Sequence, residues 1–426
     1  MLPKRQMKEV VESMAINKLI GKLLRFKGFK VTGLTFRKGN QLEIGVKPYK
    51  NGCKCPNCGR RGKIVRTRPG LRRWRDIPVC GWTVWLLYYP REIHCPTHGR
   101  CLEAISWADD YARTTYRYEY MILRYCQLMT QKAAAQLLKV SQSTLSDQLH
   151  RVIQRLRSGH RILGLKTLGV DEISYCKGHK YATLVYDLDR SVVVWVGEGK
   201  GRETIDKFFN SMLSDYQKRQ ITAASCDMSE AYIGAIKTHC PNATLVLDRF
   251  HIVKALNAAV DEVRKEQWRE ANIDDRKALK GLRWLLYRHS STRSQEDTRT
   301  LKALEKANNR IYRAWRLKDE FERFWEYNVP WAAERFLKSW MTSTLRSRLD
   351  PLKKFVGTLR KHYDGVIAFI GTRLTNAIGE GLNRIVKIVK NRASGFRTLD
   401  AFTDMIFLVV GDLDLAGQIP TKFRTL

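Results

Sequence analysis

The chain has 426 residues, and its 77 lysines and arginines against 42 aspartates and glutamates give a net charge of +35 at pH 7. Such an excess favours a polyanionic partner, and the 44% hydrophobic content excludes intrinsic disorder as the main state. No run approaches the roughly 18 consecutive apolar residues of a membrane helix. We therefore expect a soluble, cytoplasmic protein with no membrane partner, and nucleic acid is favoured because basic and aromatic residues alternate along the whole chain.

The first region, residues 1–50, is predicted to hold a short helix and a hairpin. Residues 30–36 and 41–46 have the composition of strands, and Lys38, Gly39 and Asn40 between them form a turn signal. This region leads into a cysteine-rich segment.

Residues 51–108 are predicted to be a zinc-finger domain. Two half-sites of similar sequence each place two metal-binding side chains three residues apart and follow them with glycine, which tolerates the turn that aims both at one ion. The four expected zinc ligands are Cys55, Cys58, Cys95 and His98. The alternative ligands nearby are Cys53, His94 and Cys101, and buried structural cysteines are the competing interpretation. Residues 72–77 and 83–89 are expected to form a hairpin between the half-sites.

Residues 109–162 have helical periodicity, and residues 133–146 resemble a helix-turn-helix. Val140 and Leu145 are expected in its core, while Ser141 caps the second helix. The exposed side chains expected to face base edges or phosphates are Gln142, Ser143 and Thr144. An ordinary helical hairpin is the alternative.

An α/β domain is predicted in two parts, residues 163–254 and 371–426. Its expected strands are residues 168–176, 181–188, 191–197, 221–226 and 244–247, and its expected helices are residues 203–213, 229–238 and 374–390, followed by a segment at 399–408. The order β-β-β-α-β-α-β is typical of the ribonuclease H-like fold. Residues 255–370 read as an all-helical insertion that carries six of the eleven tryptophans.

Three carboxylates are candidates for catalysis. Asp171 lies inside an apolar strand, Asp227 closes another strand, and Glu380 shares a helix face with Asn383 and Lys387. Hard oxygen ligands suit two magnesium or manganese ions, which can activate a nucleophile for phosphodiester displacement. Solvated acids at the ends of elements are the competing interpretation. Two neighbouring acids are set aside: Glu172 because strand alternation turns it to the opposite face, and Asp187 because we expect it to face solvent at a hairpin turn.

The ordered motifs resemble bacterial DDE transposases of the ISL-three insertion-sequence family. The matching blocks are CPNCG at 55–59, the helix-turn-helix, GVDE at 169–172, CDMSEAY at 226–232, LDRFHIVK at 247–254 and TNAIGEGLNRIVKIVKNRASGFR at 375–397. The resemblance implies that Asp171, Asp227 and Glu380 form the DDE triad. It also implies an active-site role for Asp248 and His251, with Asp248 in reserve as a metal ligand. The Cys-x-x-His half-site departs from the Cys-x-x-Cys that is more usual for the family.

The resemblance implies a nucleoid-associated bacterial enzyme that binds the terminal inverted repeats of its element, cleaves DNA and transfers strands into target DNA. Its partners would be double-stranded DNA and at least one further copy of the chain, since two element ends must be joined. Basic residues expected to lie along the DNA are Arg384, Lys387, Lys390, Arg392 and Arg397. The alternatives are a domesticated sequence-specific DNA-binding regulator and a ribonuclease H-like nuclease without strand transfer.

Overall fold

The computed structural model describes residues 15–22, 24, 28–49, 53–158, 161–176, 178, 180–374, 377–413 and 415. They belong to two compact units, Met1–Gly159 with Leu413–Leu426 and His160–Asp412, which we call the first and second units. The expected domain boundary at residues 50 and 51 lies outside the described residues. Among the helices that are described, none combines the length and the apolarity that a membrane span requires.

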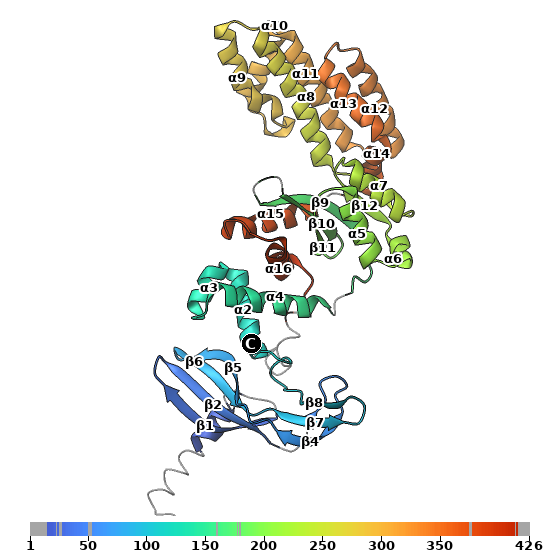
Figure 1. Cartoon of the computed structure of the whole chain (residues 1–426). Helices are drawn as coiled ribbons and strands as arrows, with labels where there is room; N and C mark the ends of the chain where they lie inside the picture. Colours follow the sequence, from blue (N-terminus) through green and yellow to red (C-terminus); the bar gives the residue numbers. More distant parts are fainter. Residues whose placement is uncertain are drawn as a thin grey trace, which may run out of the picture. The chain divides into compact units, whose positions relative to one another are not determined.

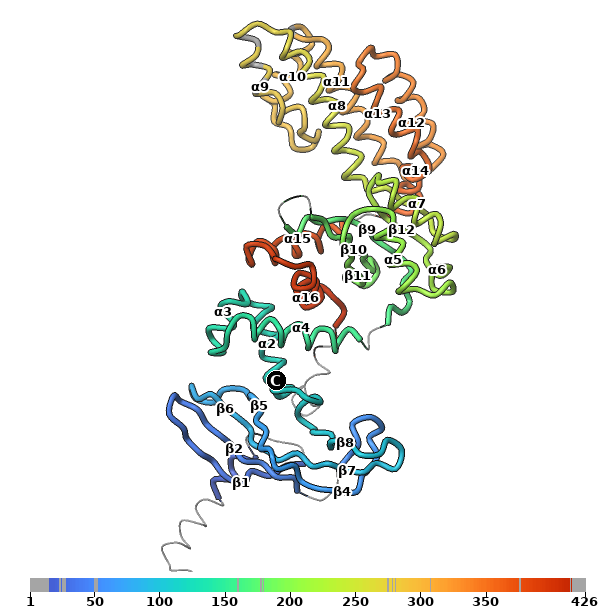
Figure 2. Tube along the Cα trace, viewed as in Figure 1, coloured from blue at the N-terminus to red at the C-terminus, as the bar shows by residue number. Residues whose placement is uncertain are grey.

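The first unit contains two four-stranded sheets (Figures 1 and 2). One has the order β1-β2-β6-β5 and begins with the predicted hairpin of β1 (Phe29–Arg37) and β2 (Gln41–Pro48). Gly39 and Asn40 turn the chain with φ of 78° and 53°, left-handed values that these two residue types tolerate. Alternate residues of β2 are buried, so the apolar face of this hairpin lines a core.

The second sheet of this unit has the order β3-β4-β7-β8 and carries the cysteine half-sites. Its strands are β3 (Cys53–Lys54), β4 (Arg61–Thr67), β7 (Arg91–Cys95) and β8 (Gly99–Leu102). The hairpin expected between the half-sites forms from β5 (Arg72–Val79) and β6 (Trp82–Tyr88), but β6 pairs with β2 in the other sheet. The β5–β6 hairpin joins that sheet because its apolar residues Trp74, Val84 and Leu86 belong to the core of that sheet.

Three helices complete the first unit: α2 (Tyr116–Leu128), α3 (Gln131–Leu137) and α4 (Gln142–Ser158). Leu145 is buried as expected, whereas Val140 is only half-buried and Leu138 takes the core position. Helix α2 is fixed to the sheet through buried Asp76 of β5, which accepts a hydrogen bond from Thr115 Oγ1 at 2.7 Å and pairs with Arg117.

A five-stranded mixed sheet of order β11-β10-β9-β12-β13 forms the centre of the second unit. The predicted antiparallel meander is β9 (Thr167–Cys176), β10 (Lys180–Asp187) and β11 (Val192–Glu198). Two short strands, β12 (Ala223–Cys226) and β13 (Thr244–Leu247), continue the sheet in parallel with β9. All five strands lie at their predicted positions, since long apolar and β-branched runs bounded by polar turns are a strong local signal.

Helices cover both faces of this sheet. On one side are α5 (Arg202–Met212), α6 (Asp215–Gln220) and α7 (Glu230–His239); on the other are α15 (Ala377–Arg392) and α16 (Leu399–Val410). Asp187, expected to face solvent, is instead buried, and its Oδ1 accepts hydrogen bonds of 3.1 Å from the backbone N–H groups of Asp189 and Arg190. The turn folds around this carboxylate, so position at a turn was a poor guide to its exposure.

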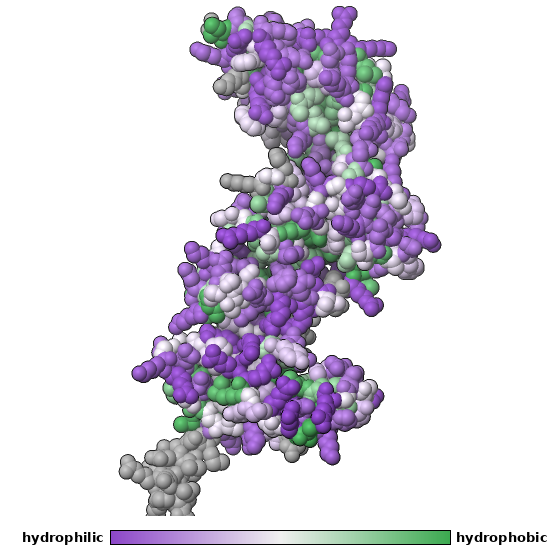
Figure 3. Space-filling view, viewed as in Figure 1, coloured by the Kyte–Doolittle hydropathy of each residue, from purple (hydrophilic) through white to green (hydrophobic). Residues whose placement is uncertain are grey.

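The predicted helical insertion follows β13. It comprises α8 (Arg249–Glu270), α9 (Ile273–Tyr287), α10 (Gln295–Ala307), α11 (Asn309–Glu322), α12 (Pro330–Leu345), α13 (Asp350–Lys361) and α14 (Tyr363–Thr372), with short 3-10 turns at Ser290–Thr292 and Arg323–Glu326. Helix α8 begins earlier than the expected residue 255 because the Asp248 side chain caps it. The visible face of these helices is mostly hydrophilic (Figure 3).

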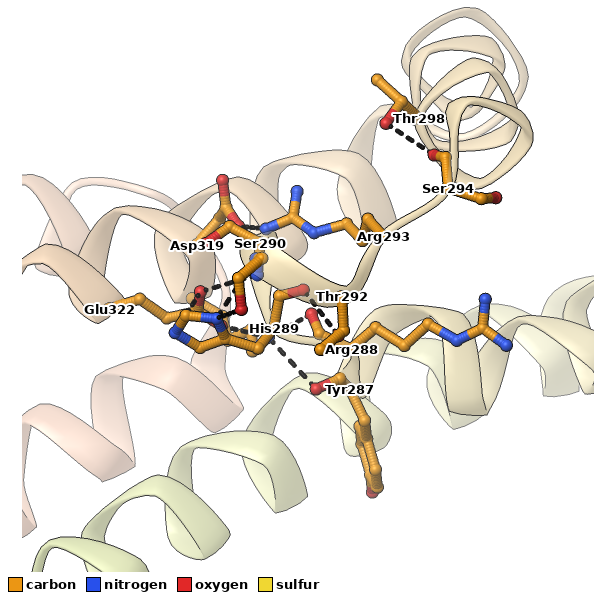
Figure 4. A network of polar contacts seen from close by, with 12 residues as sticks. Tyr287, Arg288, His289, Ser290, Thr292, Arg293, Ser294, Thr298, Asp319 and Glu322 are labelled. Carbon is orange, nitrogen blue, oxygen red and sulfur yellow. Dashed lines mark hydrogen bonds and ion pairs between the residues drawn. The ribbon is translucent and has the colours of Figure 1, made fainter.

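A polar network fixes the turn between α9 and α10 onto α11 (Figure 4). Glu322 accepts hydrogen bonds from the backbone N–H of Ser290 at 3.2 Å and from Lys318 Nζ at 2.7 Å, and lies 3.4 Å from His289 Nε2. Lys318 is buried and also donates to the carbonyl of Arg288 at 3.1 Å, which satisfies a carbonyl just past the end of α9. The buried ammonium is therefore paired rather than isolated.

Candidate functional site

Asp171 lies near the middle of β9, on the sheet face that α15 covers. Its Oδ1 accepts a hydrogen bond from the Glu172 backbone N–H at 2.8 Å, and its Oδ2 accepts one from Asn383 Nδ2 at 2.5 Å. Burial raises the pKa of this carboxyl, and the charges of Asp227 and Asp248 raise it further, whereas His251 lowers it. The charges of Asp227, Asp248 and His251 therefore all act on Asp171.

Asp227 and Asp248 directly follow two neighbouring parallel strands. Cys226 pairs in register with Leu247 at the ends of β12 and β13, so the next residues emerge at the same sheet edge. Asp227 Oδ1 accepts from the Ser229 backbone N–H at 2.9 Å, and the Asp248 backbone N–H donates to the Cys226 carbonyl at 3.0 Å. Carboxyl ends of parallel strands are where α/β folds commonly place their ligands.

The two carboxylate oxygens of Asp248 have different environments. Oδ1 accepts from the Phe250 backbone N–H at 3.0 Å and so caps α8. Oδ2 is buried and forms no hydrogen bond within the described part of the chain, although His251 Nε2 lies 3.8 Å away. A buried carboxylate oxygen without a hydrogen bond is a feature that a bound cation would explain.

Glu380 stands in the first turn of α15 and is exposed, as is Lys387 two turns further on. Asn383, between them on the same helix face, is buried and is the residue of this face that contacts Asp171. The structure therefore joins Asp171 to Asn383 by a hydrogen bond and couples it electrostatically to Asp227, Asp248 and His251. Among the described residues these acids do not bring three ligand atoms within 4.8 Å of one another, and the Glu380 carboxylate is exposed on α15.

Glu172 lies on the opposite face of β9 from Asp171. Its partner in register is Thr183 of β10, and Thr183 Oγ1 lies 3.1 Å from the hydroxyl of Tyr232 on α7. Burial raises the pKa of Glu172, with a further contribution from Asp227. This acid is electrostatically part of the same region although it points away from α15.

One residue near Asp171 was not predicted from the sequence. Tyr186 of β10 is buried, and its hydroxyl donates to Asn383 Oδ1, which links it to Asp171 through the amide. Burial and the negative charge of Asp171 raise the pKa of this phenol well above its usual range. A tyrosine in an apolar strand gives no local signal of such a role, since buried tyrosines are common in sheets.

The basic residues of α15 and the segment after it have different environments. Lys390 Nζ donates to the Ser174 carbonyl at 2.6 Å and so anchors the helix to β9. Arg384 and Arg397 are exposed, and Arg392 is half-buried. The exposed arginines remain open to a phosphate, while Lys390 has a contact within the fold.

The four expected zinc ligands meet in the second sheet of the first unit. One ligand atom from each of Cys55, Cys58, Cys95 and His98 lies within 4.8 Å of the others. Hydrogen bonds from the His98 ring and from backbone N–H groups lower the pKa of the Cys95 thiol to about 6, which favours the thiolate that zinc binds.

The alternative ligands are arranged differently. Cys101 Sγ donates to Cys55 Sγ at 3.8 Å, and burial and the neighbouring Cys55 raise its pKa to about 11. Cys53 is buried beside Glu103, and burial and that charge raise its pKa to about 12. His94 faces away in β7, where it is exposed. These environments favour Cys101 and Cys53 as thiols.

The helix-turn-helix presents the expected face. Ser141 Oγ accepts from the Thr144 backbone N–H at 3.1 Å, the capping bond predicted for this position, and Lys139 makes the turn with φ of 52°. Gln142, Ser143 and Thr144 are exposed in the first turn of α4, while Leu145 and Leu149 hold the helix from beneath.

These features define a DNA-binding enzyme: one unit holds a mixed sheet with acids at its strand ends, and the other unit carries a helix-turn-helix. Comparison with known proteins agrees. Residues 168–406 match a family described as transposase, of the DDE group of ISL3, and residues 103–153 match the helix-turn-helix domain of transposase family ISL3. The chain belongs to the ISL3 family of transposases.

Two curated relatives extend over nearly the whole chain. The transposase for insertion sequence element IS1001 of Bordetella parapertussis is 31% identical over 394 residues, 90% of this chain and 96% of the relative. The transposase for IS1557 of Mycobacterium tuberculosis is 25% identical over 392 residues, 86% of this chain and 87% of the relative. A solved structure, the Drosophila P element transposase strand transfer complex, matches with a TM-score of 0.35 and 10% identity over 70% of this chain and 92% of that one.

Proposed function

We propose that this transposase acts through a DDE triad of Asp171, Asp227 and Glu380. The observation that carries the proposal is that Asp171 is buried and coupled to two further acids: burial raises its pKa, and the charges of Asp227 and Asp248 raise it further. Such a cluster is unfavourable by itself, and perturbed acids of this kind are typical of active sites. Glu380 would complete the triad from α15, the helix whose Asn383 donates a hydrogen bond to Asp171.

The donor set fits magnesium or manganese. All candidate ligands are carboxylate oxygens, and one of them, Asp248 Oδ2, is buried without a hydrogen bond among the described residues. Asp171, Asp227 and Glu380 would hold two ions, with Asp248 in reserve for Asp227. When bound, the ions supply activation of the attacking oxygen and stabilisation of the leaving oxygen.

The remaining side chains prepare the site. Asn383 and the Glu172 backbone N–H each occupy one oxygen of Asp171 and so fix the direction of its free lone pairs. His251 would orient Asp248 or the donor strand. Lys387 and Arg384, exposed on α15, would neutralise phosphates near the reacting bond.

The sheet order β11-β10-β9-β12-β13 supports a ribonuclease H-like catalytic domain, formed by residues 163–254 and 371–426 and interrupted by the helical domain at 255–370. We further propose that residues 1–50, 51–108 and 109–162 are the hairpin, zinc-finger and helix-turn-helix domains. Cys55, Cys58, Cys95 and His98 would bind one structural zinc ion.

The DNA substrate would be the terminal inverted repeats of the element and then target DNA. The first turn of α4, with Gln142, Ser143 and Thr144, would read the repeat in the major groove. The reaction joins two ends, so it would require at least a dimer of this chain on the bacterial nucleoid.

An end-joining assay tests the proposal. Purified protein is incubated with a labelled duplex of the element end, a target plasmid and Mg²⁺, and wild type is compared with Glu380→Gln, Asp171→Asn and Asp227→Asn. The matched control is Glu203→Gln, because Glu203 is also exposed in the first turn of a helix but lies on the other face of the sheet.

We expect strand transfer from wild type and the control and none from the three variants, all of which should still bind the duplex. Cleavage without joining by wild type would indicate a nuclease, and binding without cleavage would indicate a regulator. Loss of DNA binding together with cleavage would make the acids structural and contradict the triad.

A further inference from the structure

A cleft in the first unit is lined by four arginines. It has a volume of about 580 Å³ and lies where the two sheets of the unit meet the segment before α2. Its charged and aromatic lining residues are Arg66, Arg68, Arg72, Arg113 and Tyr111. They come from β4, β5, the loop between those strands and the chain that leads into α2, so no single sequence window contains the set.

Most of this positive charge lacks a carboxylate partner. Arg66 pairs with Glu92, with 2.9 Å between Arg66 Nε and Glu92 Oε2. Arg68, Arg72 and Arg113 form no ion pair within the described ranges of the chain. Burial lowers the pKa of Arg72, and the positive charges of Arg113 and Arg68 lower it further, against the opposing effect of Tyr111 and Asp110.

Backbone hydrogen bonds fix the chain around the cleft, where Arg66, Arg68 and Arg113 are exposed and Arg72 is half-buried. The Arg68 backbone N–H donates to the Pro90 carbonyl at 3.0 Å, and the Arg113 carbonyl accepts from the Arg75 backbone N–H at 2.8 Å. Arg72 lies over the ring of Trp74, with its Cζ 4.9 Å from the ring centroid. Arg68 and Arg113, on fixed backbones and without carboxylate partners among the described residues, suit an anion with several oxygens, because a guanidinium can bind phosphate with two parallel hydrogen bonds.

Tyr111 gives an independent indication. Its side chain is 80% exposed and its φ is 60°, a left-handed value that is unusual for a bulky residue. A conformation of this kind persists where the surrounding structure fixes it. Here it keeps an aromatic ring and a hydroxyl donor at the cleft.

We infer that this arginine cleft binds the phosphate backbone of the DNA that the helix-turn-helix reads. Both lie in the first unit, and Tyr111 and Arg113 lead directly into α2, so one duplex would be held at two places by one unit. The contacts are to phosphates, so they contribute affinity and register rather than sequence preference. The inference rests on the proposed function in one respect, that the polyanion is DNA.

The salt dependence of binding tests this inference. The full chain and the double variant Arg68→Gln/Arg113→Gln are titrated with a fluorescent duplex of the element end at several salt concentrations without divalent metal. The control, Lys30→Gln/Lys38→Gln, removes the same charge from exposed residues of the β1–β2 hairpin, at the opposite edge of the sheet from β5.

We expect the cleft variant to bind more weakly and to lose about 2 from the slope of log affinity against log salt, about 1 for each phosphate contact. The control should keep the wild-type slope. As a second variant, Tyr111→Ala should weaken binding without changing the slope, because it removes no charge. Equal slopes for wild type and the cleft variant, or an equal loss in the control, would overturn the inference.

This result is separable from the proposed chemistry. If wild type binds the duplex with a cleft-dependent slope but neither cleaves nor joins the ends, DNA binding by the cleft is supported and the triad is contradicted. If ends are joined but the slope of log affinity against log salt does not depend on Arg68 and Arg113, the triad is supported and DNA binding by the cleft is contradicted. A thermal melt of each variant confirms that the first unit remains folded.

Discussion

Asn383 on α15 donates a hydrogen bond to Asp171 on β9, with 2.5 Å between Nδ2 and Oδ2, across 212 residues of sequence. The same amide accepts from the Tyr186 hydroxyl through Oδ1. Because the buried phenol has a raised pKa, it stays protonated and donates. Asn383 must therefore present its NH₂ group to Asp171, so Tyr186 is a positioning residue for the proposed metal ligand.

Removing the Tyr186 hydroxyl should weaken metal binding. In Tyr186→Phe the Asn383 amide loses the donor that sets its orientation, and one hydrogen bond is worth ~1 kcal/mol. We expect the Mg²⁺ concentration for half-maximal cleavage to rise about five-fold, with full activity recovered at high Mg²⁺. The matched control is Tyr175→Phe, a buried tyrosine whose hydroxyl donates to Glu198 at 3.2 Å instead. An equal shift in both variants would contradict the positioning role.

Neutralising Asp171 should stabilise the protein in the absence of divalent metal. The folded-state pKa of Asp171 is raised, so ionisation destabilises the native state as pH rises through that value. We expect Asp171→Asn to melt at a higher temperature than wild type at pH 7. The difference should shrink as pH falls below the usual carboxyl range, because both side chains are then neutral. Thermal melts across this pH range measure it, and a less stable variant at pH 7 would refute it.

Two substitutions of Asp248 separate its role as a helix cap from metal binding. Asparagine caps helices about as well as aspartate, so Asp248→Asn should melt like wild type while binding Mn²⁺ more weakly. Asp248→Ala should lose ~1 kcal/mol of stability as well. Metal titration and thermal melts of both variants give the two readouts. Unchanged Mn²⁺ affinity in Asp248→Asn would limit Asp248 to capping.

The zinc assignment predicts metal content residue by residue. Wild type should contain one zinc ion per chain, and Cys95→Ser should contain none, because the thiolate favoured by His98 is lost. Cys80→Ser is the control, since Cys80 is exposed and lies outside the ligand cluster. Cys101→Ser should also retain zinc. Loss of zinc from that variant would show that Cys101 is a ligand in place of one of the four expected residues. Elemental analysis after gel filtration decides between these outcomes.

The first turn of α4 should matter for DNA and not for folding. Gln142 is exposed, so Gln142→Ala should leave the melting temperature unchanged and weaken binding to the element end more than to an unrelated duplex. Ser141→Ala removes the capping bond to Thr144 and should cost ~1 kcal/mol of stability. Equal loss of affinity for both duplexes in Gln142→Ala would restrict this residue to phosphate contact.

Local patterns predicted most elements. The strands of the second unit and the β1–β2 hairpin follow from alternation and turn residues, and the helices of the insertion follow from their 3.6-residue period. The same reasoning failed for Asp187, which is buried, and for Val140, which yields its core position to Leu138. Burial of single residues depends on what packs over them, and that information is not local.

Local sequence is sufficient to predict the order of the strands and helices, the presence of acids at strand ends and the pairing of the zinc half-sites, because neighbouring residues fix backbone conformation. The contact of Tyr186 with Asn383 and the pairing of β6 with β2 depend instead on how distant segments pack. The same packing brings Arg66, Arg68, Arg72 and Arg113 to one cleft. These arrangements connect distant segments, and they arise because apolar faces must be buried together whatever their separation in the chain.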